Sequence, residues 1–194
     1  MVFLASGGLD SSVLLWKMKR DGHDVVPLFI DYGQKAAVQE HRAAAYICRE
    51  IGIRLRRIDI PGLSRIDNGL SDPVHGASHV FHARNMILFS VAASLAASRY
   101  MRVIGAGIRD DSFPDQARAF VDSSEEALTD AVGSRMILFA PLVTFSKLEV
   151  ARLGRDDGVP MDVTYSCYMG GPAPCRRCPS CLDRQRALDL AWKD

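Results

Sequence analysis

Small and hydroxyl-bearing residues gather near the start of the chain, in the run Ala5-Ser6-Gly7-Gly8-Leu9-Asp10-Ser11-Ser12. The run follows apolar residues 2–4 and precedes the amphipathic segment 13–18, which predicts a strand, a tight turn and a helix. A helix N-terminus offers unpaired N–H groups and the positive end of its dipole, glycines allow close backbone approach, and hydroxyls add donors. We therefore expect a site for an anion, most simply a phosphate.

The type of phosphate site is narrowed by what the run does not contain. It has neither the Gly-x-x-x-x-Gly-Lys-Ser/Thr pattern of a Walker A loop nor the Gly-x-Gly-x-x-Gly pattern of a dinucleotide fingerprint. Asp10 would repel bare phosphate, but a hard cation such as Mg²⁺ binds carboxylate and phosphate oxygens together. The run therefore predicts a site for a nucleotide that carries Mg²⁺.

A second cluster with metal chemistry lies near the end of the chain. Four of the five cysteines, Cys167, Cys175, Cys178 and Cys181, have the spacing Cys-x7-Cys-x2-Cys-x2-Cys. Four thiolates close a tetrahedral Zn²⁺ site and leave no open position for catalysis, so we expect one structural zinc ion. An iron–sulfur cluster uses the same ligands and is the competing interpretation.

Alternating strand and helix patterns must position both clusters. They predict βαβ units and an open parallel sheet, in an α/β fold with helices on both faces. Expected strands cover residues 2–4, 25–30, 54–60, 102–107 and 136–142, and expected helices cover 35–50, 80–99, 117–132, 146–154 and 180–192. Ligands bind outside the carboxyl ends of such strands, so Asp31-Tyr32-Gly33-Gln34 and the strand ending in Gly105-Ala106-Gly107 should share a rim with the first loop.

The bulk composition limits the class of protein. The chain has 194 residues, 48% of them hydrophobic, and a net charge of +1. We expect an α/β nucleotide-binding domain over residues 1–160 and a zinc-binding segment over 161–194 packed on it. The near-neutral charge gives no sign of a direct nucleic-acid partner, and no apolar run approaches the length of a membrane span. No basic region precedes an apolar stretch at the N-terminus, so no signal peptide is expected. A cytoplasmic location is therefore expected.

The first loop resembles the Ser-Gly-Gly-x-Asp-Ser loop of the PP-loop ATP pyrophosphatases, in which it holds the pyrophosphate of ATP. The resemblance extends over nearly the whole chain to the 7-cyano-7-deazaguanine synthase (QueC) family. The pieces that carry it are residues 6–12, residues 31–34, Arg84-Asn85, Pro114-Asp115, residues 164–168, the later cysteines and Arg184. It implies a PP-loop fold of the adenine nucleotide alpha hydrolase type, and a homodimer.

The resemblance also implies the chemistry. ATP would activate 7-carboxy-7-deazaguanine as an acyl-adenylate, ammonia would give the amide, and a second adenylation with loss of AMP would give the nitrile. ATP and Mg²⁺ would be held by residues 5–12, Asp31, Tyr32, Gly33, Gln34, Asn85 and Gly105, with Asp10, Ser11, Arg84 and Lys147 as catalytic residues. Phe113, Asp115 and Tyr165 would contact the deazapurine.

Several alternatives stay open at this point. The chain has Phe113-Pro114-Asp115-Gln116 where the family usually has Tyr-Pro-Asp-Cys, near the expected acceptor pocket. One alternative is therefore a related adenylating enzyme that stops at the amide or uses another acceptor, in DNA modification or antiviral defence. Another is a PP-loop enzyme of tRNA thiolation or lysidine formation, although those usually need a basic RNA surface. The last is a non-catalytic, zinc-stabilised nucleotide-binding module.

Overall fold

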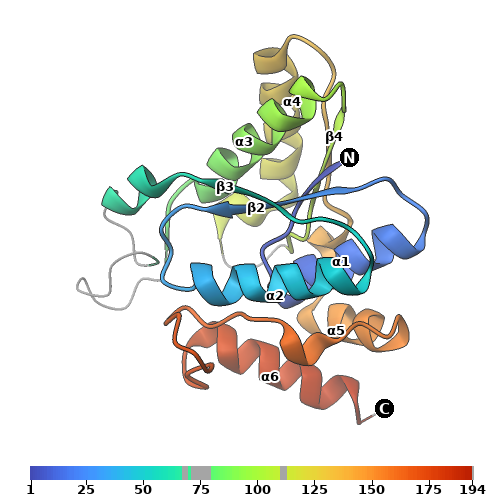
Figure 1. Cartoon of the computed structure of the whole chain (residues 1–194), viewed down its shortest axis with the longest axis vertical. Coiled ribbons are helices and arrows are strands. Elements are labelled where there is room, and N and C mark those ends of the chain that lie inside the picture. The colour runs from blue at the N-terminus through green and yellow to red at the C-terminus, as the bar shows by residue number, and fades with distance from the viewer. Residues whose placement is uncertain (67–69, 71–79, 110–112, 194) are drawn as a thin grey trace.

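A computed structural model describes residues 1–66, 70, 80–109 and 113–193 (Figure 1). Its five strands form one parallel sheet in the order β3-β2-β1-β4-β5. The strands are β1 (Val2–Leu4), β2 (Val26–Asp31), β3 (Arg56–Asp59), β4 (Val103–Ala106) and β5 (Ile137–Phe139). The predicted open parallel sheet is confirmed, with the first of these strands at its centre.

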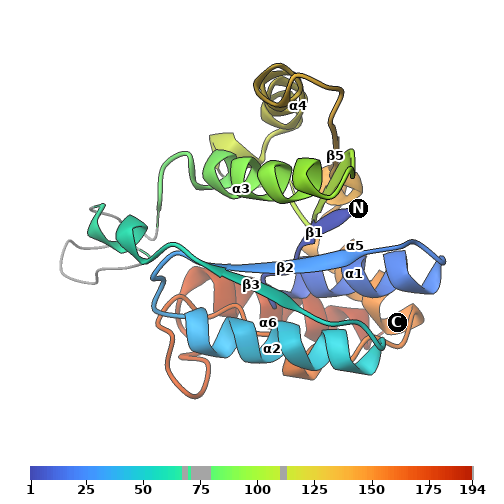
Figure 2. The same cartoon turned by 45° about the horizontal axis from the view of Figure 1, so that its top comes forward.

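Helices cover both faces of the sheet, as predicted (Figure 2). One face carries α1 (Leu9–Arg20), α2 (Ala37–Glu50), α5 (Lys147–Asp156) and α6 (Pro179–Ala191), and the other carries α3 (Arg84–Ser98) and α4 (Arg118–Val132). Successive strand residues point to opposite faces, so Phe3 of β1 packs in the first core and Val2 in the second. The central strand therefore holds the two layers of helices together.

The chain end packs into the first of these cores. Ala187 and Ala191 of α6 lie in the same buried cluster as Val13 of α1 and Val150 of α5. The Arg155 guanidinium at the end of α5 also donates to the Ala191 carbonyl in the last turn of α6. The helix after the cysteines is thus part of the main hydrophobic core.

The start of α3 and the end of β5 differ from the predicted positions, because tertiary contacts override the local sequence pattern there. The helix expected from residue 80 begins at Arg84, and Ala83 before it is left-handed with φ 55°. The strand expected to residue 142 ends at Phe139, after which Pro141–Thr144 form a 3-10 turn. The predicted capping box at the start of α5 is confirmed: Ser146 Oγ accepts from the Glu149 N–H at 3.2 Å, and the Glu149 carboxylate accepts from the Ser146 N–H at 2.7 Å.

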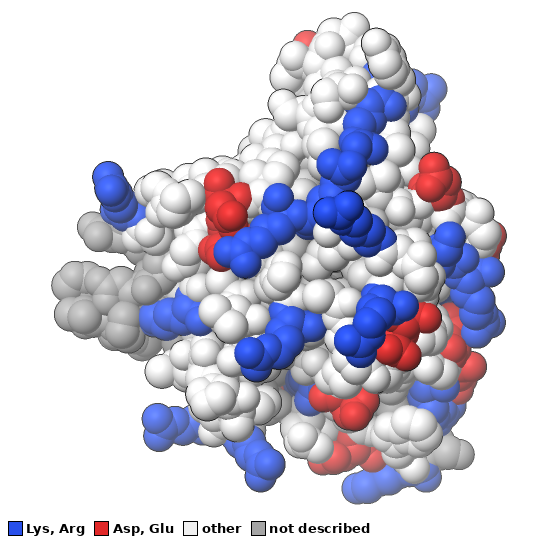
Figure 3. Space-filling model, viewed as in Figure 1, with Lys and Arg blue, Asp and Glu red and all other residues white. Residues whose placement is uncertain are grey.

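The two edge strands of the sheet are protected in different ways against pairing with another chain. β3 exposes Arg56 and Arg57 at one edge of the sheet, where Lys and Arg side chains cross the face shown in Figure 3. Charged side chains on an edge strand oppose its pairing with another chain. At the other edge, the Glu125 carboxylate of α4 accepts from the Leu138 N–H of β5 at 2.7 Å. No helix among the described residues has the length and apolar character needed to cross a bilayer.

The loop after β1 depends on a glycine that no other residue can replace. Gly7 has φ 74°, and a Cβ added there would lie 2.1 Å from the Glu40 carbonyl oxygen of α2. We expect Gly7→Ala to lower the free energy of unfolding by roughly 3 kcal/mol, through left-handed strain and forced displacement of α2. Urea denaturation followed by circular dichroism measures this loss.

Gly22→Ala is the matched control. Gly22 also has a positive φ, 84°, but a Cβ added there would have no atom within 4 Å. Gly22→Ala should lower the free energy of unfolding by only about 1 kcal/mol, because it introduces left-handed backbone strain without a steric clash. Equal losses for the two variants would contradict the close approach of the loop to α2.

Candidate active site and metal centre

The loop that joins β1 to α1 holds its own donors in place. Ser6 Oγ and Ser11 Oγ lie 2.8 Å apart, and the Ser11 hydroxyl also donates to the Gly8 carbonyl at 3.2 Å. Gly8 is the N-cap of α1 and supplies no side-chain cap, so that first turn presents N–H groups to whatever occupies the loop. The Tyr165 N–H donates to the Gly7 carbonyl at 2.9 Å and ties the loop to the segment before the cysteines.

Asp10 is the centre of an ion-pair cluster. Its Oδ2 lies 2.7 Å from Lys147 Nζ and 3.4 Å from Arg109 Nε, and Arg109 Nη2 lies 3.5 Å from Asp183 Oδ2 of α6. Lys147 occupies the first turn of α5, where a cation is unfavourable for the helix dipole, and Asp10 compensates for it. Asp10 Oδ1 is buried and has no hydrogen-bond partner among the described residues. That free oxygen suits a hard cation.

A cavity of about 220 Å³ lies at the carboxyl ends of the strands, where we expected the nucleotide. It brings together predicted residues from the loop, the end of β2 and the start of α3, namely Ala5, Ser6, Asp10, Ser11, Tyr32, Gln34, Arg84 and Asn85. We refer to it as the loop cavity. Gln34 Nε2 donates to the Glu40 carboxylate at 2.9 Å, and burial raises the pKa of Glu40, which also lines this space.

Seven of the predicted nucleotide residues do not line the loop cavity, namely Gly7, Gly8, Leu9, Ser12, Asp31, Gly33 and Gly105, and neither does the predicted catalytic residue Lys147. Asp31 accepts from the Gly33 N–H at 2.9 Å and pairs with Arg57 at 2.8 Å, so this carboxylate shapes the turn after β2. Neither Asp31 nor Gly33 lines the loop cavity. Gly105 lies inside β4, where a Cβ would be 2.6 Å from the Phe3 ring, and its place in the cavity wall is taken by Gly107.

Arg84 is a partly buried cation with a buried Nε, and Tyr32, Asp115 and Glu40 lie near it. Burial acts to lower the pKa of Arg84, but Tyr32, Asp115 and Glu40 together raise it above its ordinary value. Burial in turn raises the pKa of the Tyr32 hydroxyl to about 12. Arg84 Nε is buried and has no hydrogen-bond partner within the described part of the chain. The guanidinium therefore keeps one donor for a ligand.

A second cavity of about 610 Å³ lies beside α3 and is rich in aromatic side chains; we refer to it as the aromatic cavity. It includes the predicted substrate residues Phe113 and Asp115, and is lined further by Val80, Phe81, His82, Ala83, Arg84, Pro114, Gln116, Phe120 and Tyr168. Arg84 and Gln116 line both cavities. The two spaces therefore share a boundary formed in part by a cation and an amide.

Asp115 and Tyr165 make structural contacts that the sequence did not reveal. The Asp115 carboxylate accepts from the Asn85 backbone N–H at 3.1 Å, and Asn85 Nδ2 donates to the Asp115 carbonyl at 2.7 Å. The Tyr165 hydroxyl donates to the Gly171 carbonyl at 2.8 Å, and burial raises the pKa of Tyr165. Tyr165 lines neither cavity, and it connects the loop to the cysteine segment.

Sequence reasoning missed several residues of these walls. Glu40 and Gln116 were not assigned to the site, and Arg109 was not expected to meet Asp10. Gly107 also lines the loop cavity. It follows Gly105 by two residues at the end of the expected strand 102–107, so the sequence did indicate that a glycine there could line the site. Nothing near Glu40 in the sequence distinguishes it from the solvent-facing glutamates of a helix.

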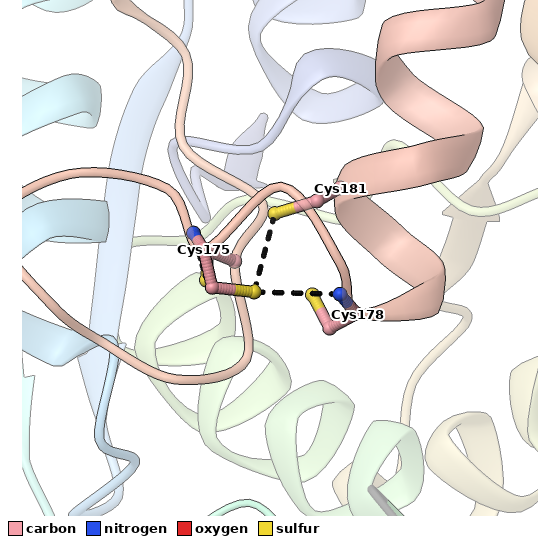
Figure 4. A group of neighbouring side chains, drawn as sticks. Cys175, Cys178 and Cys181 are labelled. Atoms are coloured by element: carbon pink, nitrogen blue, oxygen red, sulfur yellow. Dashed lines mark hydrogen bonds between the residues drawn. The ribbon is translucent and has the colours of Figure 1, made fainter.

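The four predicted cysteine ligands converge. Cys175, Cys178 and Cys181 direct their sulfur atoms toward one another in Figure 4, and the ligand atoms of all four cysteines lie within 4.8 Å of one another. The Cys175 and Cys181 sulfurs are 4.0 Å apart. Zn–S bonds of about 2.3 Å in a tetrahedron require sulfurs about 3.8 Å apart, so the cluster fits a metal with little movement.

The turn between two of the ligands favours a thiolate. Arg176 takes a left-handed conformation with φ 59°, and the Cys178 N–H donates to Cys175 Sγ at 3.3 Å. Backbone donors from Arg177 and Cys178 lower the pKa of Cys175 to about 6. The Arg184 guanidinium of α6 donates to the Met161 carbonyl at 2.7 Å and anchors the segment before the cluster.

Solved structures share this fold. A 4-thiouridine synthetase in complex with RNA and ATP superposes with a TM-score of 0.58 at 20% identity, covering 100% of this chain and 53% of that one. The NH3-dependent NAD synthetase of Campylobacter jejuni superposes with a TM-score of 0.53 at 17% identity, covering 84% of this chain and 65% of that one. At these identities the likeness concerns the arrangement of strands and helices alone.

Curated relatives match over nearly their full length. The 7-cyano-7-deazaguanine synthase of Sulfurihydrogenibium sp. is 34% identical, with 100% of this chain and 96% of the relative covered. Those of Aquifex aeolicus and Methanopyrus kandleri are 31% and 34% identical, with 97% and 98% of this chain and 95% and 94% of the relatives covered. The family model described as queuosine biosynthesis protein QueC matches residues 1–191. On these matches, the chain belongs to the QueC family.

Proposed function

We propose that this protein converts 7-carboxy-7-deazaguanine and ammonia to 7-cyano-7-deazaguanine, as an ATP-dependent carbon–nitrogen ligase. The observation that carries the proposal is the position of Arg84, a partly buried residue that lines both the loop cavity and the aromatic cavity and whose Nε is buried without a hydrogen-bond partner among the described residues. With ATP in the first and the deazapurine in the second, the α-phosphate and the carboxylate meet at this cation. The names of the curated relatives support the same reaction.

The reaction needs activation because a carboxylate has no good leaving group. A carboxylate oxygen attacks the α-phosphorus of ATP, and pyrophosphate leaves. Ammonia then attacks the acyl carbon, and AMP leaves to give the amide. In a second round the amide oxygen attacks another α-phosphorus and pyrophosphate leaves, and loss of both N–H protons and of AMP then gives the nitrile. Positioning of the reactants and stabilisation of negative charge are the protein's contribution to each step.

The loop cavity supplies the groups that such a reaction requires. The first-turn N–H groups of α1 and the hydroxyls of Ser6 and Ser11 bind the polyphosphate, and Ser12 follows in the same turn. Asp10 would hold Mg²⁺ through its unpaired Oδ1, and the ion would offset phosphate charge. With such an ion bound, Lys147 would be freed in part from Asp10 and would donate to the departing pyrophosphate, and Arg84, which lines the loop cavity, would stabilise charge at the α-phosphate.

The aromatic cavity would hold the deazapurine. Phe113 offers a ring on which a flat heterocycle stacks, and Phe81 and Tyr168 line the same space. Asp115 holds the start of α3, and with it Arg84, through its two bonds to Asn85. Tyr165 keeps the phosphate loop in register with the cysteine segment. A homodimer and a cytoplasmic location remain predictions from the resemblance and the composition.

A product assay tests the proposed function. Purified protein with Mg-ATP, 7-carboxy-7-deazaguanine and ammonium should yield the nitrile, with twice as much AMP as nitrile because each nitrile needs both adenylations. Mass spectrometry resolves the nitrile from the amide. Accumulation of the amide alone would assign a shortened reaction, and no AMP with any acceptor would leave only a nucleotide-binding module.

Lys147 should affect chemistry more than folding. We expect Lys147→Met to reduce kcat for AMP formation by roughly 100-fold, because a donor to a departing anion is worth about 3 kcal/mol in a water-poor site. Lys17→Met is the control, since Lys17 pairs with Asp21 at 3.0 Å on the exposed side of α1 and such pairs contribute little. A kcat for Lys147→Met within threefold of wild type would exclude this role.

The metal should hold the end of the chain, and we propose that it is one structural Zn²⁺ per chain. Elemental analysis should give one zinc per chain, and its removal by a chelator should lower the Tm and expose α6 to protease first, because metal-ligand energy is folding energy. Cys175→Ser should behave as the chelated protein does. Cys48→Ser is the control, since Cys48 is a buried thiol of α2 outside the cluster. Iron in place of zinc, or unchanged protease resistance after complete metal removal, would contradict the assignment.

A further inference from the structure

The boundary between the two cavities contains both a hydrogen-bond donor and an acceptor without partners. Arg84 Nε and Gln116 Oε1 are buried, and neither has a hydrogen-bond partner among the described residues. Of those residues, Arg84 and Gln116 are the two that line both the loop cavity and the aromatic cavity. Buried polar atoms in native structures are nearly always paired, so this complementary pair indicates a ligand that accepts at one end and donates at the other.

The position of Gln116 is fixed by its neighbours. It ends the 3-10 turn Pro114–Gln116, and its N–H donates to the Phe113 carbonyl at 3.0 Å. Asp115 in the same turn is bonded twice to Asn85, the residue after Arg84. The carboxamide of Gln116 is therefore placed relative to the start of α3 by a short hydrogen-bonded link.

We propose that Gln116 determines specificity for the nitrogen nucleophile and for the amide intermediate. Gln116 Oε1 accepts an N–H of ammonia and then of the amide, while the Arg84 Nε–H donates to the acyl oxygen. This inference rests on the proposed function. A primary amide carries N–H donors and a carbonyl acceptor on one carbon, which is the complement of the unpaired groups.

The role of Gln116 in the step is to orient the nitrogen. The nitrogen lone pair forms the C–N bond, the bond from the acyl carbon to the AMP oxygen breaks, and AMP leaves with that electron pair. The surplus proton passes to water, because a carboxamide is not a base. The amide, held at the same two groups, keeps its oxygen at the boundary with the loop cavity. It is retained there for the second adenylation.

Substitution of Gln116 separates this role from folding. Gln116→Met keeps the length of the side chain and removes the acceptor. It should raise the KM for ammonia about tenfold, release amide before the nitrile forms and leave the KM for ATP within twofold, since one hydrogen bond is lost. Gln39→Met is the control, because within the described part of the chain the Gln39 side chain only accepts from the exposed Arg42, at 3.4 Å on α2. Gln116→Glu keeps an acceptor oxygen and should preserve the KM for ammonia, while its charge raises the KM for ATP.

A binding measurement gives a readout that does not need turnover. By isothermal titration with a non-hydrolysable ATP analogue present, the Kd of the synthetic amide should rise about tenfold in Gln116→Met, whereas the Kd of the nucleotide should not change. An unchanged KM for ammonia and Kd of the amide would overturn the inference. So would a rise confined to the KM of the carboxylate substrate, which would assign Gln116 to the deazapurine ring. Absence of AMP from the wild-type protein would instead overturn the proposed function.

Discussion

A single carboxylate joins four separate parts of the chain. Asp10 in the first turn of α1 meets Lys147 at the start of α5 and Arg109 after β4, and Arg109 continues to Asp183 on α6. Side chains of Asp10 and Lys147 are only 18% and 14% exposed, so their attraction is screened less than that of a surface pair. The geometry of the loop cavity depends on this balance, because each cation facing the loop is held there by a counter-charge.

The ion pairs of Asp10 with Lys147 and Arg109 leave one carboxylate oxygen available for another cation. Both cations share Asp10 Oδ2, and Oδ1 is unoccupied by any described group. On the proposed function, an anion that arrives with its metal would give the carboxylate a cation on one oxygen and would give the lysine an anion to neutralise. Such a site needs little reorganisation, since its charges are already placed where new charge develops. The loop glycines and the capping box of α5 provide the rigid backbone on which this exchange takes place.

The sequence allowed a good prediction of the strands and helices and a less complete prediction of the residues that line the two cavities. Local sequence patterns predict the alternation of strands and helices, the loop between β1 and α1, and the cysteine cluster. The parallel sheet and the convergence of the cysteines are confirmed. The start of α3 was predicted four residues early, because Asp115, a residue from another turn, accepts from the backbone N–H of Asn85 in its first turn. Gly105 was assigned to the nucleotide, but Gly107 lines the loop cavity, because strand register decides which of the two glycines faces the Phe3 ring and which faces the cavity.

The order in which these elements are synthesised has a consequence for how the site matures. β1 is made before the strands β2 and β4 that flank it, and Lys147 is 137 residues from its partner Asp10. The Tyr165 N–H likewise donates to the Gly7 carbonyl in the loop between β1 and α1. Contacts so distant in sequence form slowly and late. In a nascent chain the loop between β1 and α1 therefore lacks these contacts until the cysteine segment has emerged. On the proposed function, tight nucleotide binding would then mark a chain that has been synthesised as far as α6.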